Sequence, residues 1–300
     1  MSLRYILVAC GSFNPVHNFH LRMLELTKDE LKRRFKTNSL PITAASMSSI
    51  SSDSSSSVPA KVRTQFYTPK SQRRSTSPQK IKSSNSSNAE TNSSSNTSSD
   101  LSDSQFIGLL SPVSDGYKKK GLQPISIRSK LIELACQSSE WISLSSWEGN
   151  RKEWTPTKDV LLKIKSDYSN LNSVPTSSPI KTEVVFICGA DVFCSFLKPG
   201  LWKNEDLIEI LNNCYLSVLE RDGFDCQKVL NEHLIFQEDN DLKNKVIFVE
   251  DELVDNLSST FIRKQLLKGA SVKYLVPDGV AEYLIKNDVY LGGFLFIRLQ

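Results

Sequence analysis

The sequence RYILVACGSFNPVHNFH, at residues 4–20, decides the fold. Its first part, Tyr5–Ala9, is a short apolar run that ends in Cys10-Gly11, which is typical of an interior strand in a parallel sheet. From His20 to about Lys36 the apolar residues recur at helical spacing, and lysine and arginine crowd the end of this segment, as the helix dipole favours. A strand, a glycine turn and a helix in this order predict the opening unit of a doubly wound α/β sheet.

Strands and helices continue to alternate along the rest of the chain. We expect further strands at Gln105–Leu110, Trp141–Leu144, Glu183–Cys188, Leu216–Leu219 and Val246–Val249. We expect further helices at Ile125–Gln137, Glu148–Ile164, Asn204–Asn213, Ser259–Leu267 and Asp278–Lys286. This alternation predicts a single domain over residues 1–300, with a parallel sheet covered by helices on both faces.

Residues 37–104 break this pattern, because about a third of them are serine and much of the rest is Asn, Thr, Pro, Lys and Arg. Such a segment cannot bury enough apolar area to offset its ordering entropy, so we predict a disordered insertion within the domain. Its Thr68-Pro69 and Ser77-Pro78 steps suit phosphorylation, and a tolerated surface loop without that role is the simpler alternative. Residues 170–181 form a second, shorter polar stretch, which we expect to be a linker.

Composition and charge narrow the class of protein. The 300 residues are 39% hydrophobic and 23% charged, and the net charge of +4 does not by itself indicate nucleic acid as a partner. The six cysteines are scattered without a C-x-x-C pair, which disfavours a zinc ribbon or a disulfide framework and fits a reducing compartment. No segment suits a signal peptide or a membrane span, so we expect a protein of the nucleus or cytoplasm without a membrane partner.

The loop after the first strand offers groups that suit phosphate. In an open parallel sheet, ligands bind beyond the carboxyl ends of the strands. Gly11 lets the backbone approach an anion, Ser12 offers a hydroxyl, and free N–H groups with the helix dipole favour negative charge. His17 and His20 are three residues apart and therefore lie on one side of the helix start. Ordinary surface histidines are an alternative, and a metal pair is weaker because no third ligand is suggested nearby.

A second phosphate-type motif, LSSTFIR, occupies Leu257–Arg263. Its serines and threonine open a helix and offer hydroxyls and N-terminal amides, and Arg263 adds a forked cation one turn later. Taken alone, the serines could simply cap the helix. Two independent motifs of this kind, near opposite ends of an α/β chain, favour a nucleotide site.

GSFNPVHNFH resembles the (H/T)-x-x-H signature of the adenylyl- and cytidylyltransferases, and LSSTFIR resembles their second signature, I-S-S-T-x-x-R. The resemblance implies their Rossmann-like fold. The middle of the chain is similar to one branch of these enzymes, the eukaryotic nicotinamide/nicotinic acid mononucleotide adenylyltransferases. The motifs that carry this closer resemblance are Ser111-Pro112, Tyr117–Leu122, Trp147-Glu148, Glu153-Trp154, Cys188–Asp191, Leu201–Lys203 and Lys273–Asp278.

The resemblance implies roles for the matching residues. It places His20, His17 and Arg263 in the catalytic machinery, where His20 contacts the ATP phosphates and Thr260–Arg263 bind the β- and γ-phosphates. The mononucleotide phosphate is expected at Lys119 and Ser12. The other expected substrate contacts are Gly11, Phe13, Trp154, Thr157, Gly189, Asp191, Leu201, Trp202, Arg221, Ser258, Ser259, Thr260, Phe261 and Ile262.

Among these contacts, Trp154 and Trp202 match aromatic residues that sandwich the pyridine ring, and flat π-faces suit such a ring. Without the resemblance, isolated tryptophans would more often belong to the core, and Lys118–Lys120 would be a solvated loop. Asp191 matches a position close to the ribose or to a metal ion.

The chain departs from the family pattern at a few positions. His17 stands where this branch often has threonine, and Leu257 replaces isoleucine. Phe261 occupies a position that is usually polar or basic, which could alter the contact with the ATP tail. The insertion after the first helix is unusual. None of these changes removes a residue that the chemistry requires.

The sequence thus predicts an enzyme that transfers AMP from ATP to the 5′-phosphate of a pyridine mononucleotide by direct in-line attack, with Mg²⁺ or another divalent cation accompanying ATP. The products would be pyrophosphate and NAD or deamido-NAD. Relatives form homo-oligomers, and the oligomeric state of this chain stays open. A related enzyme with another acceptor is one alternative, and a catalytically weak, chaperone-like protein that keeps the fold is another. The intact residues of both motifs argue against the second alternative.

Overall fold

The computed structural model describes residues 2–37, 101–170, 180–251 and 257–290. Most of the predicted insertion at 37–104 and of the predicted linker at 170–181 lies outside the described residues. Both interpretations therefore stay predictions for those segments, and the apolar C-terminal end from residue 291 onward lies outside as well.

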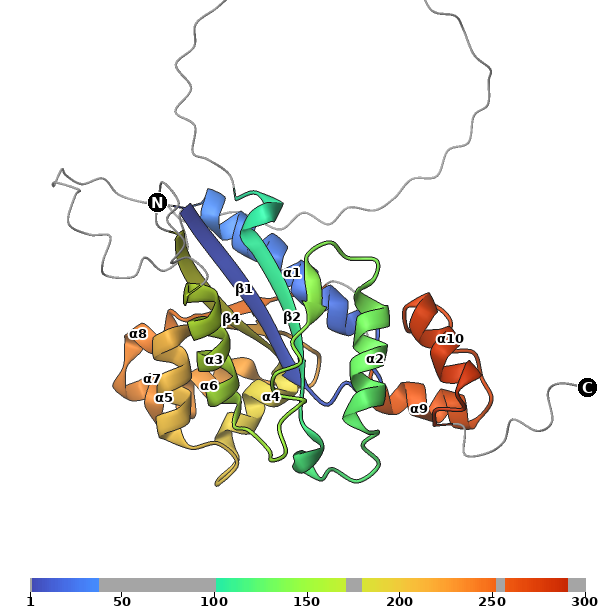
Figure 1. Cartoon of the computed structure of the whole chain (residues 1–300). Helices are drawn as coiled ribbons and strands as arrows, with labels where there is room; N and C mark the ends of the chain where they lie inside the picture. Colours follow the sequence, from blue (N-terminus) through green and yellow to red (C-terminus); the bar gives the residue numbers. More distant parts are fainter. Residues whose placement is uncertain (1, 38–100, 171–179, 252–256, 291–300) are drawn as a thin grey trace, which may run out of the picture. The chain divides into compact units, whose positions relative to one another are not determined.

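A parallel sheet of six strands forms the centre of the described chain (Figure 1). The strands follow the spatial order β3-β2-β1-β4-β5-β6, and every neighbouring pair is parallel. Their bounds are β1 Ser2–Gly11, β2 Phe106–Pro112, β3 Ile142–Leu144, β4 Ile180–Gly189, β5 Cys214–Leu219 and β6 Val246–Val249. The predicted α/β class, with a Rossmann-like doubly wound sheet, is confirmed.

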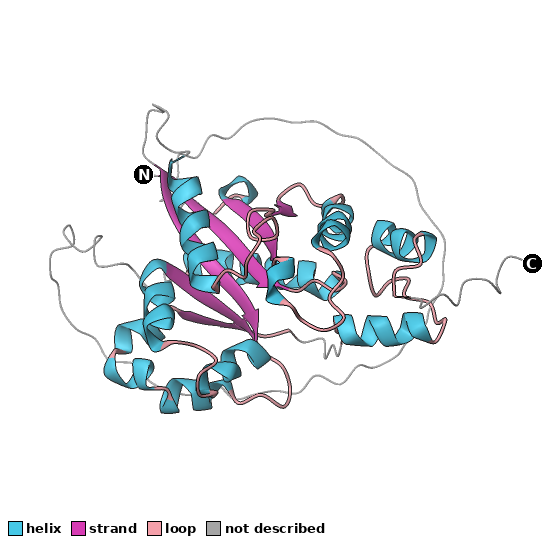
Figure 2. Cartoon of the chain, turned by 60° about the horizontal axis from the view of Figure 1, so that its bottom comes forward, coloured by secondary structure: helices cyan, strands magenta, loops and turns pink. Residues whose placement is uncertain are grey.

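Helices cover both faces of the sheet (Figures 1 and 2). In β1, Leu7 packs into one core layer and its neighbours Ile6 and Val8 into the other, because successive side chains point to opposite faces. The first layer contains α1 (Asn18–Lys36), α2 (Ile125–Cys136), α9 (Ser259–Leu267) and α10 (Asp278–Lys286). The second layer contains α3 (Thr157–Asn170), α4 (Ala190–Cys194), α5 (Asn204–Asn213), α6 (Cys226–Glu232), α7 (Leu234–Glu238) and α8 (Asn240–Lys243).

The helix predicted at Glu148–Ile164 begins only at Thr157, so its predicted start was wrong. Pro156 lies directly before it, and proline suits a helix start but not a helix interior. The preceding residues form turns and irregular structure, in which the buried Glu148 carboxylate accepts a hydrogen bond from Ser111 Oγ at 2.6 Å. The helix therefore begins directly after Pro156, and Glu148 belongs to the segment before it, where it contacts the end of β2.

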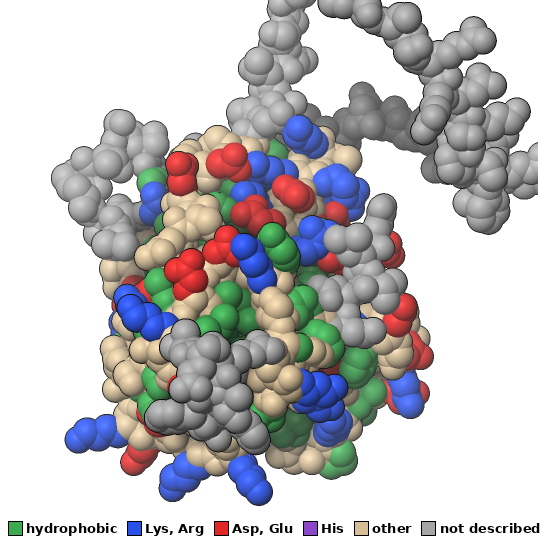
Figure 3. All heavy atoms as spheres, turned by 90° about the vertical axis from the view of Figure 1, so that its right-hand side faces the viewer, with side chains coloured by type: hydrophobic (Ala, Val, Ile, Leu, Met, Phe, Trp, Pro, Cys, Tyr) green, Lys and Arg blue, Asp and Glu red, His purple; other side chains and the backbone are tan. Residues whose placement is uncertain are grey.

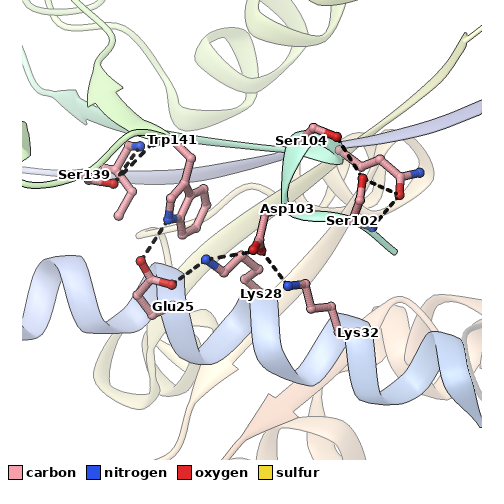
Figure 4. Close-up of polar contacts among 10 residues, drawn as sticks. Glu25, Lys28, Lys32, Ser102, Asp103, Ser104, Ser139 and Trp141 are labelled. Atoms are coloured by element: carbon pink, nitrogen blue, oxygen red, sulfur yellow. Dashed lines mark hydrogen bonds and ion pairs between the residues drawn. The ribbon is translucent and has the colours of Figure 1, made fainter. Parts of the chain in front are cut away.

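The chain re-enters the described structure at Leu101 and is fixed to α1 there (Figure 4). Leu101 is 6% exposed and joins the core layer on the α1 side. Asp103 begins the 3₁₀ helix η2 (Asp103–Gln105), and its carboxylate lies 2.5 Å from Lys32 Nζ and 3.8 Å from Lys28 Nζ. Residues 101–104, which we expected to be part of the insertion, thus belong to the folded part because Leu101 has core to pack against.

Side chains of both charge signs are interspersed on the face of the protein that Figure 3 shows. Among the residues that the structure describes, no helix combines the length and the apolar character that crossing a membrane requires. All six cysteines are free, as expected for scattered cysteines without a disulfide framework.

Candidate active site

The carboxyl ends of the central strands meet at one edge of the sheet. The pairing register sets Gly11 of β1 beside Pro112 of β2, and Gly189 of β4 beside Leu219 of β5. Strands β1 and β4 are neighbours, although β2 and β3 lie between them in sequence. The strand order reverses at this point, and in open α/β sheets such a switch point opens a crevice where ligands bind. The loops after β1 and β4 therefore flank the candidate site.

The rings of His17 and His20 stack at the start of α1, with centroids 3.6 Å apart and planes at 22°. Phe13, which is buried and has a φ of 44°, packs edge-on against His20 with the centroids 4.9 Å apart. The prediction that both histidines lie on one side of the helix start is confirmed. His17 is the N-cap and only 3% exposed, so the half-buried His20 is the more accessible imidazole.

Both imidazoles are neutral in the free protein. Burial lowers the pKa of His17 to about 3, with a contribution from the charge of Arg221. Burial, and then the neighbouring His17, lowers the pKa of His20 well below its ordinary value of 6.5. Because the N–H of His17 donates to Nδ1 of His20 at 3.1 Å, the proton of the neutral His20 ring is on Nε2. His20 can therefore donate an N–H to an anion, and a bound phosphate would raise its pKa.

Two backbone N–H groups at the start of α1 have partners inside the protein, contrary to our expectation of free groups. The N–H of His17 donates to Nδ1 of His20, and the N–H of Asn18 donates to the carbonyl of Leu275 at 3.1 Å. The side-chain amide of Asn18 also donates to the carbonyl of Tyr274 at 2.7 Å. The loop before α10 thus covers this helix start, and an anion here depends more on side chains and on the second motif.

Helix α9 docks directly on the loop after β1. Ser259 Oγ donates to the carbonyl of Pro15 at 2.8 Å, and Arg263 Nη1 donates to the carbonyl of Asn14 at 2.7 Å. Arg263 Nη2 also donates to Thr260 Oγ1 at 3.2 Å, so two of its five N–H donors are used in these contacts. The two phosphate-type motifs, 244 residues apart between Pro15 and Ser259, are therefore in direct contact.

The residues of the second motif have different surroundings. Ser258 caps α9, because its Oγ accepts the N–H of Phe261 at 3.2 Å, so the simple capping interpretation holds for this serine. Phe261 is 40% exposed and lies on the accessible side of the helix. Ile262 is fully buried in the core, which leaves only its backbone for the predicted substrate contact.

Arg221 brings a further cation to the same place. It follows β5 at the carboxyl edge of the sheet, and its guanidinium carbon lies 5.3 Å from the centre of the Phe19 ring. Its Nη2 donates to the carbonyl of Leu257 at 3.4 Å, and its charge acts on His17. Arg221 therefore lies between the start of α1 and the second motif.

On the other side of the switch point, Gly189 caps α4 and Asp191 lies in the first turn of that helix. A Cβ on Gly189 would lie 2.6 Å from Asp191 Oδ1, so a larger residue here would make this carboxylate turn away from the strand end. Asp191 is exposed there. The predicted pair thus forms one local unit at the end of β4.

Trp202 follows α4 in the chain and packs in the same helix layer, where two contacts hold its indole ring. Its Nε1 donates to Ser195 Oγ at 2.9 Å, and its ring meets Phe196 at 5.0 Å in a T-shaped arrangement. The indole is half-buried, while the adjacent Leu201 is 59% exposed. Trp202 therefore keeps part of its ring available for a ligand.

The lysine loop follows β2. Lys118 has a left-handed backbone with a φ of 52°, and Lys119 is exposed. The side-chain amide of Asn14 donates to the carbonyl of Gly121 at 2.9 Å, which fixes this loop to the loop after β1. Trp154 is 52% exposed, and Thr157 begins α3.

Sequence reasoning missed Arg128, a fully buried residue on α2. Its three nitrogen atoms donate to the carbonyl of Gln123 at 2.7 Å, the carbonyl of Ser12 at 3.1 Å and Oδ1 of Asp115 at 2.9 Å. It thereby joins the loop after β1 to the loop that carries Lys119. A signal was present, because core residues of α2 follow Arg128 three, four and seven positions later, on the same side of the helix.

Phosphate-type groups from two distant motifs at the switch point of this sheet define a nucleotide-binding α/β protein of the nucleotidyltransferase class. A comparison with protein families matches residues 96–265 to the cytidylyltransferase-like family. The chain belongs to this family and, within it, to the nicotinamide/nicotinic acid mononucleotide adenylyltransferases.

Two curated relatives show the extent of the similarity. The chain is 32% identical to a nicotinamide/nicotinic acid mononucleotide adenylyltransferase of Arabidopsis thaliana, over 95% of this chain and 89% of the relative. It is 29% identical to nicotinamide/nicotinic acid mononucleotide adenylyltransferase 1 of Bos taurus, over 95% of this chain and 88% of the relative. The fold is similar to that of the Plasmodium falciparum nicotinic acid mononucleotide adenylyltransferase complexed with NaAD, with a TM-score of 0.51, 15% identity, and coverage of 96% of this chain and 97% of that chain.

Proposed function

We infer that this protein transfers AMP from ATP to the 5′-phosphate of nicotinamide or nicotinate mononucleotide, releasing pyrophosphate and forming NAD or deamido-NAD. Family membership gives the reaction, and one structural observation supports its location. That observation is the docking of α9 on the loop after β1 through Ser259 and Arg263, which brings both phosphate-type motifs to one crevice.

On the ATP side, His20, Arg263 and Arg221 are the proposed phosphate contacts. His20 offers a neutral N–H donor on Nε2, and Arg263 has N–H donors beyond the two that its described contacts use. Donors that are fixed before the reaction stabilise charge without reorganising, and this is the largest contribution to many enzymatic rate enhancements. His17 acts on the reaction through the ring of His20, on which it stacks.

On the acceptor side, Lys119 and Ser12 are the proposed contacts of the mononucleotide phosphate, and Trp154 and Trp202 those of the pyridine ring. Both tryptophans keep part of their ring surface accessible, as stacking on a planar ligand requires. Direct attack of this phosphate on the α-phosphorus of ATP needs no covalent enzyme intermediate. Catalysis then consists of positioning and of charge stabilisation.

A divalent cation fits this site as a companion of ATP. Among the described residues, no three His, Cys, Asp or Glu side chains gather as the ligands of a metal ion. Mg²⁺ is commonly held by one or two carboxylates together with substrate phosphates, and the exposed Asp191 at the end of β4 suits that role. When bound, the ion would neutralise charge on the phosphates.

The reaction is tested by incubating the purified protein with ATP, Mg²⁺ and nicotinamide mononucleotide and measuring pyrophosphate. His20→Ala should lower turnover about 100-fold or more, because it removes one preorganised donor. His233→Asn is a suitable control, since His233 caps α7 in the other helix layer and asparagine can also cap. Full turnover in the His20→Ala protein would refute the assignment of His20.

Binding measurements separate this function from that of a chaperone-like protein with the same fold. ATP and the mononucleotide should each raise the melting temperature of the enzyme. Turnover with nicotinamide and nicotinate mononucleotides, measured side by side, determines the preferred acceptor. Light scattering tests the homo-oligomer that the resemblance implies, and microscopy of the tagged chain tests a nuclear against a cytoplasmic location.

A further inference from the structure

We propose that the turn η3 (Asp115–Tyr117) is a rigid spacer that fixes the separation between Lys119 and Trp154 and thereby selects the length of the acceptor nucleotide. Ser114 and Gly116 are its positioning residues. This inference rests on the proposed function, in which Lys119 binds the phosphate of the mononucleotide and Trp154 stacks on its pyridine ring.

Gly116 packs directly on the backbone of Glu153 and Trp154. A Cβ on Gly116 would lie 2.7 Å from the backbone nitrogen of Trp154 and 2.8 Å from both Cα and the carbonyl carbon of Glu153. These neighbours are main-chain atoms, so they cannot rotate away as a flexible side chain could. Only glycine allows the turn to lie this close to the segment that carries the tryptophan.

A hydrogen bond holds the same two segments together. Ser114, which is 1% exposed, donates from Oγ to the carbonyl of Glu153 at 2.9 Å. The donor lies directly before the turn, and the acceptor lies directly before Trp154. The hydrogen bond and the close packing of Gly116 therefore fix the turn to the tryptophan segment at two adjacent points.

The opposite side of the turn is fixed to α2. Asp115 accepts from the fully buried Arg128 at 2.9 Å and from the N–H of Ile125 at 3.1 Å. The chain then reverses at Lys118, in the left-handed region, and presents the exposed Lys119. The turn is thus clamped between α2 and the tryptophan segment, and Lys119 follows a clamped stretch of backbone.

The consequence is a fixed separation between the backbone that leads to Lys119 and the backbone that carries Trp154, and both side chains are accessible. A phosphate on Lys119 and a ring on Trp154 belong to one ligand, so the spacer favours mononucleotides of matching length. A shift of about 1 Å in a substrate-positioning group can lower catalytic efficiency about 100-fold. The ATP-binding motifs lie on other loops, so loosening the spacer should act on the mononucleotide and leave ATP binding unchanged.

The test compares two variants of the spacer with wild type under steady-state conditions, varying nicotinamide mononucleotide and ATP separately. Gly116→Ala should raise the KM for the mononucleotide about 10-fold or more, and Ser114→Ala should raise it severalfold, while the KM for ATP changes less than about twofold. Gly279→Ala, in α10, is the matched control, because a Cβ on Gly279 would meet Leu134 at an ordinary contact distance of 3.7 Å. Isothermal titration with the mononucleotide checks that KM follows affinity.

An unchanged mononucleotide KM in both variants would overturn the proposal, and so would an equal rise in both KM values, since that indicates a general structural defect. If Gly116→Ala does not fold, Ser114→Ala alone decides between these outcomes. Failure of the proposed function has a different signature, because the wild-type protein would then release no pyrophosphate with either mononucleotide.

Discussion

Replacing Glu148 by glutamine should remove a loss of stability that sets in as the pH rises. Glu148 is 3% exposed, and its Oε2 accepts a hydrogen bond from Ser111 Oγ at 2.6 Å. Burial raises the pKa of this carboxyl from its ordinary value of 4.5 to about 7, although the Ser111 hydrogen bond and the charge of Arg128 act in the opposite direction. The folded protein therefore favours the protonated form.

The sign of the effect follows from the raised pKa. Below about pH 4.5 the carboxyl is protonated in the folded and the unfolded protein, so its ionisation has no effect on stability. Between about pH 4.5 and pH 7 the unfolded chain releases the proton while the folded protein keeps it, so the free energy of unfolding falls as the pH rises. At about 1.4 kcal/mol for each pKa unit, the full loss above pH 7 is about 3.5 kcal/mol.

Urea unfolding at pH 5 and pH 8 measures this loss. Glutamine cannot ionise, and it keeps an oxygen that accepts from Ser111. The free energy of unfolding of Glu148→Gln, relative to wild type, should therefore increase by roughly 2–3 kcal/mol between the two pH values. Glu140→Gln, at an exposed glutamate, is the control, and its difference from wild type should not change. The same difference between Glu148→Gln and wild type at both pH values would refute the reasoning.

Two further substitutions test the packing of the fold, one beside the candidate site and one where the chain re-enters the described structure. Arg128→Met should lower the free energy of unfolding by about 1–3 kcal/mol in urea, because it leaves the carbonyls of Gln123 and Ser12 without their donor, and an unchanged free energy would contradict this. Leu101→Ala should lower it by about 2–3 kcal/mol by opening a cavity where the chain re-enters the fold, whereas Asp103→Asn, at an exposed side chain, should shift the urea midpoint little. Equal shifts for Leu101→Ala and Asp103→Asn would contradict the docking of this segment.

Most of the sheet and its longer helices could be predicted from the sequence, because each carries an apolar pattern of the right period between polar residues. The bounds of α5, α9, α10 and β6 agree with the prediction. The short helices α4 and α6–α8 were not predicted, since helices of 4–7 residues are too brief to show a period. The start of α3 follows Pro156, a local signal that the apolar spacing upstream of it hid, whereas no local pattern contains the contact between Ser111 and Glu148.

The location of the candidate site could be predicted from the sequence, but the hydrogen bonds within it could not. Topology alone brings the loop after β1 and the loop after β4 to the switch point, so the expected crevice follows from the strand order. Which groups face a ligand depends on tertiary packing. Two groups that the motifs could offer to phosphate are used inside the protein instead. The hydroxyl of Ser259 donates to Pro15 and joins the two motifs, and the N–H of Asn18 donates to Leu275 in the loop before α10.

Asn14 fixes the lysine loop and the second motif relative to each other. Its Nδ2 donates to the carbonyl of Gly121, its Oδ1 accepts from the N–H of Gln123 and from the hydroxyl of Tyr290, and its backbone carbonyl accepts from Arg263. An amide can donate and accept at once, whereas a carboxylate would repel the carbonyl of Gly121 and an apolar side chain would satisfy none of the three side-chain partners. Because Asn14 is 6% exposed and its amide and carbonyl contact three loops, it fixes the lysine loop relative to the second motif, and the proposed in-line transfer between two bound nucleotides requires such an alignment.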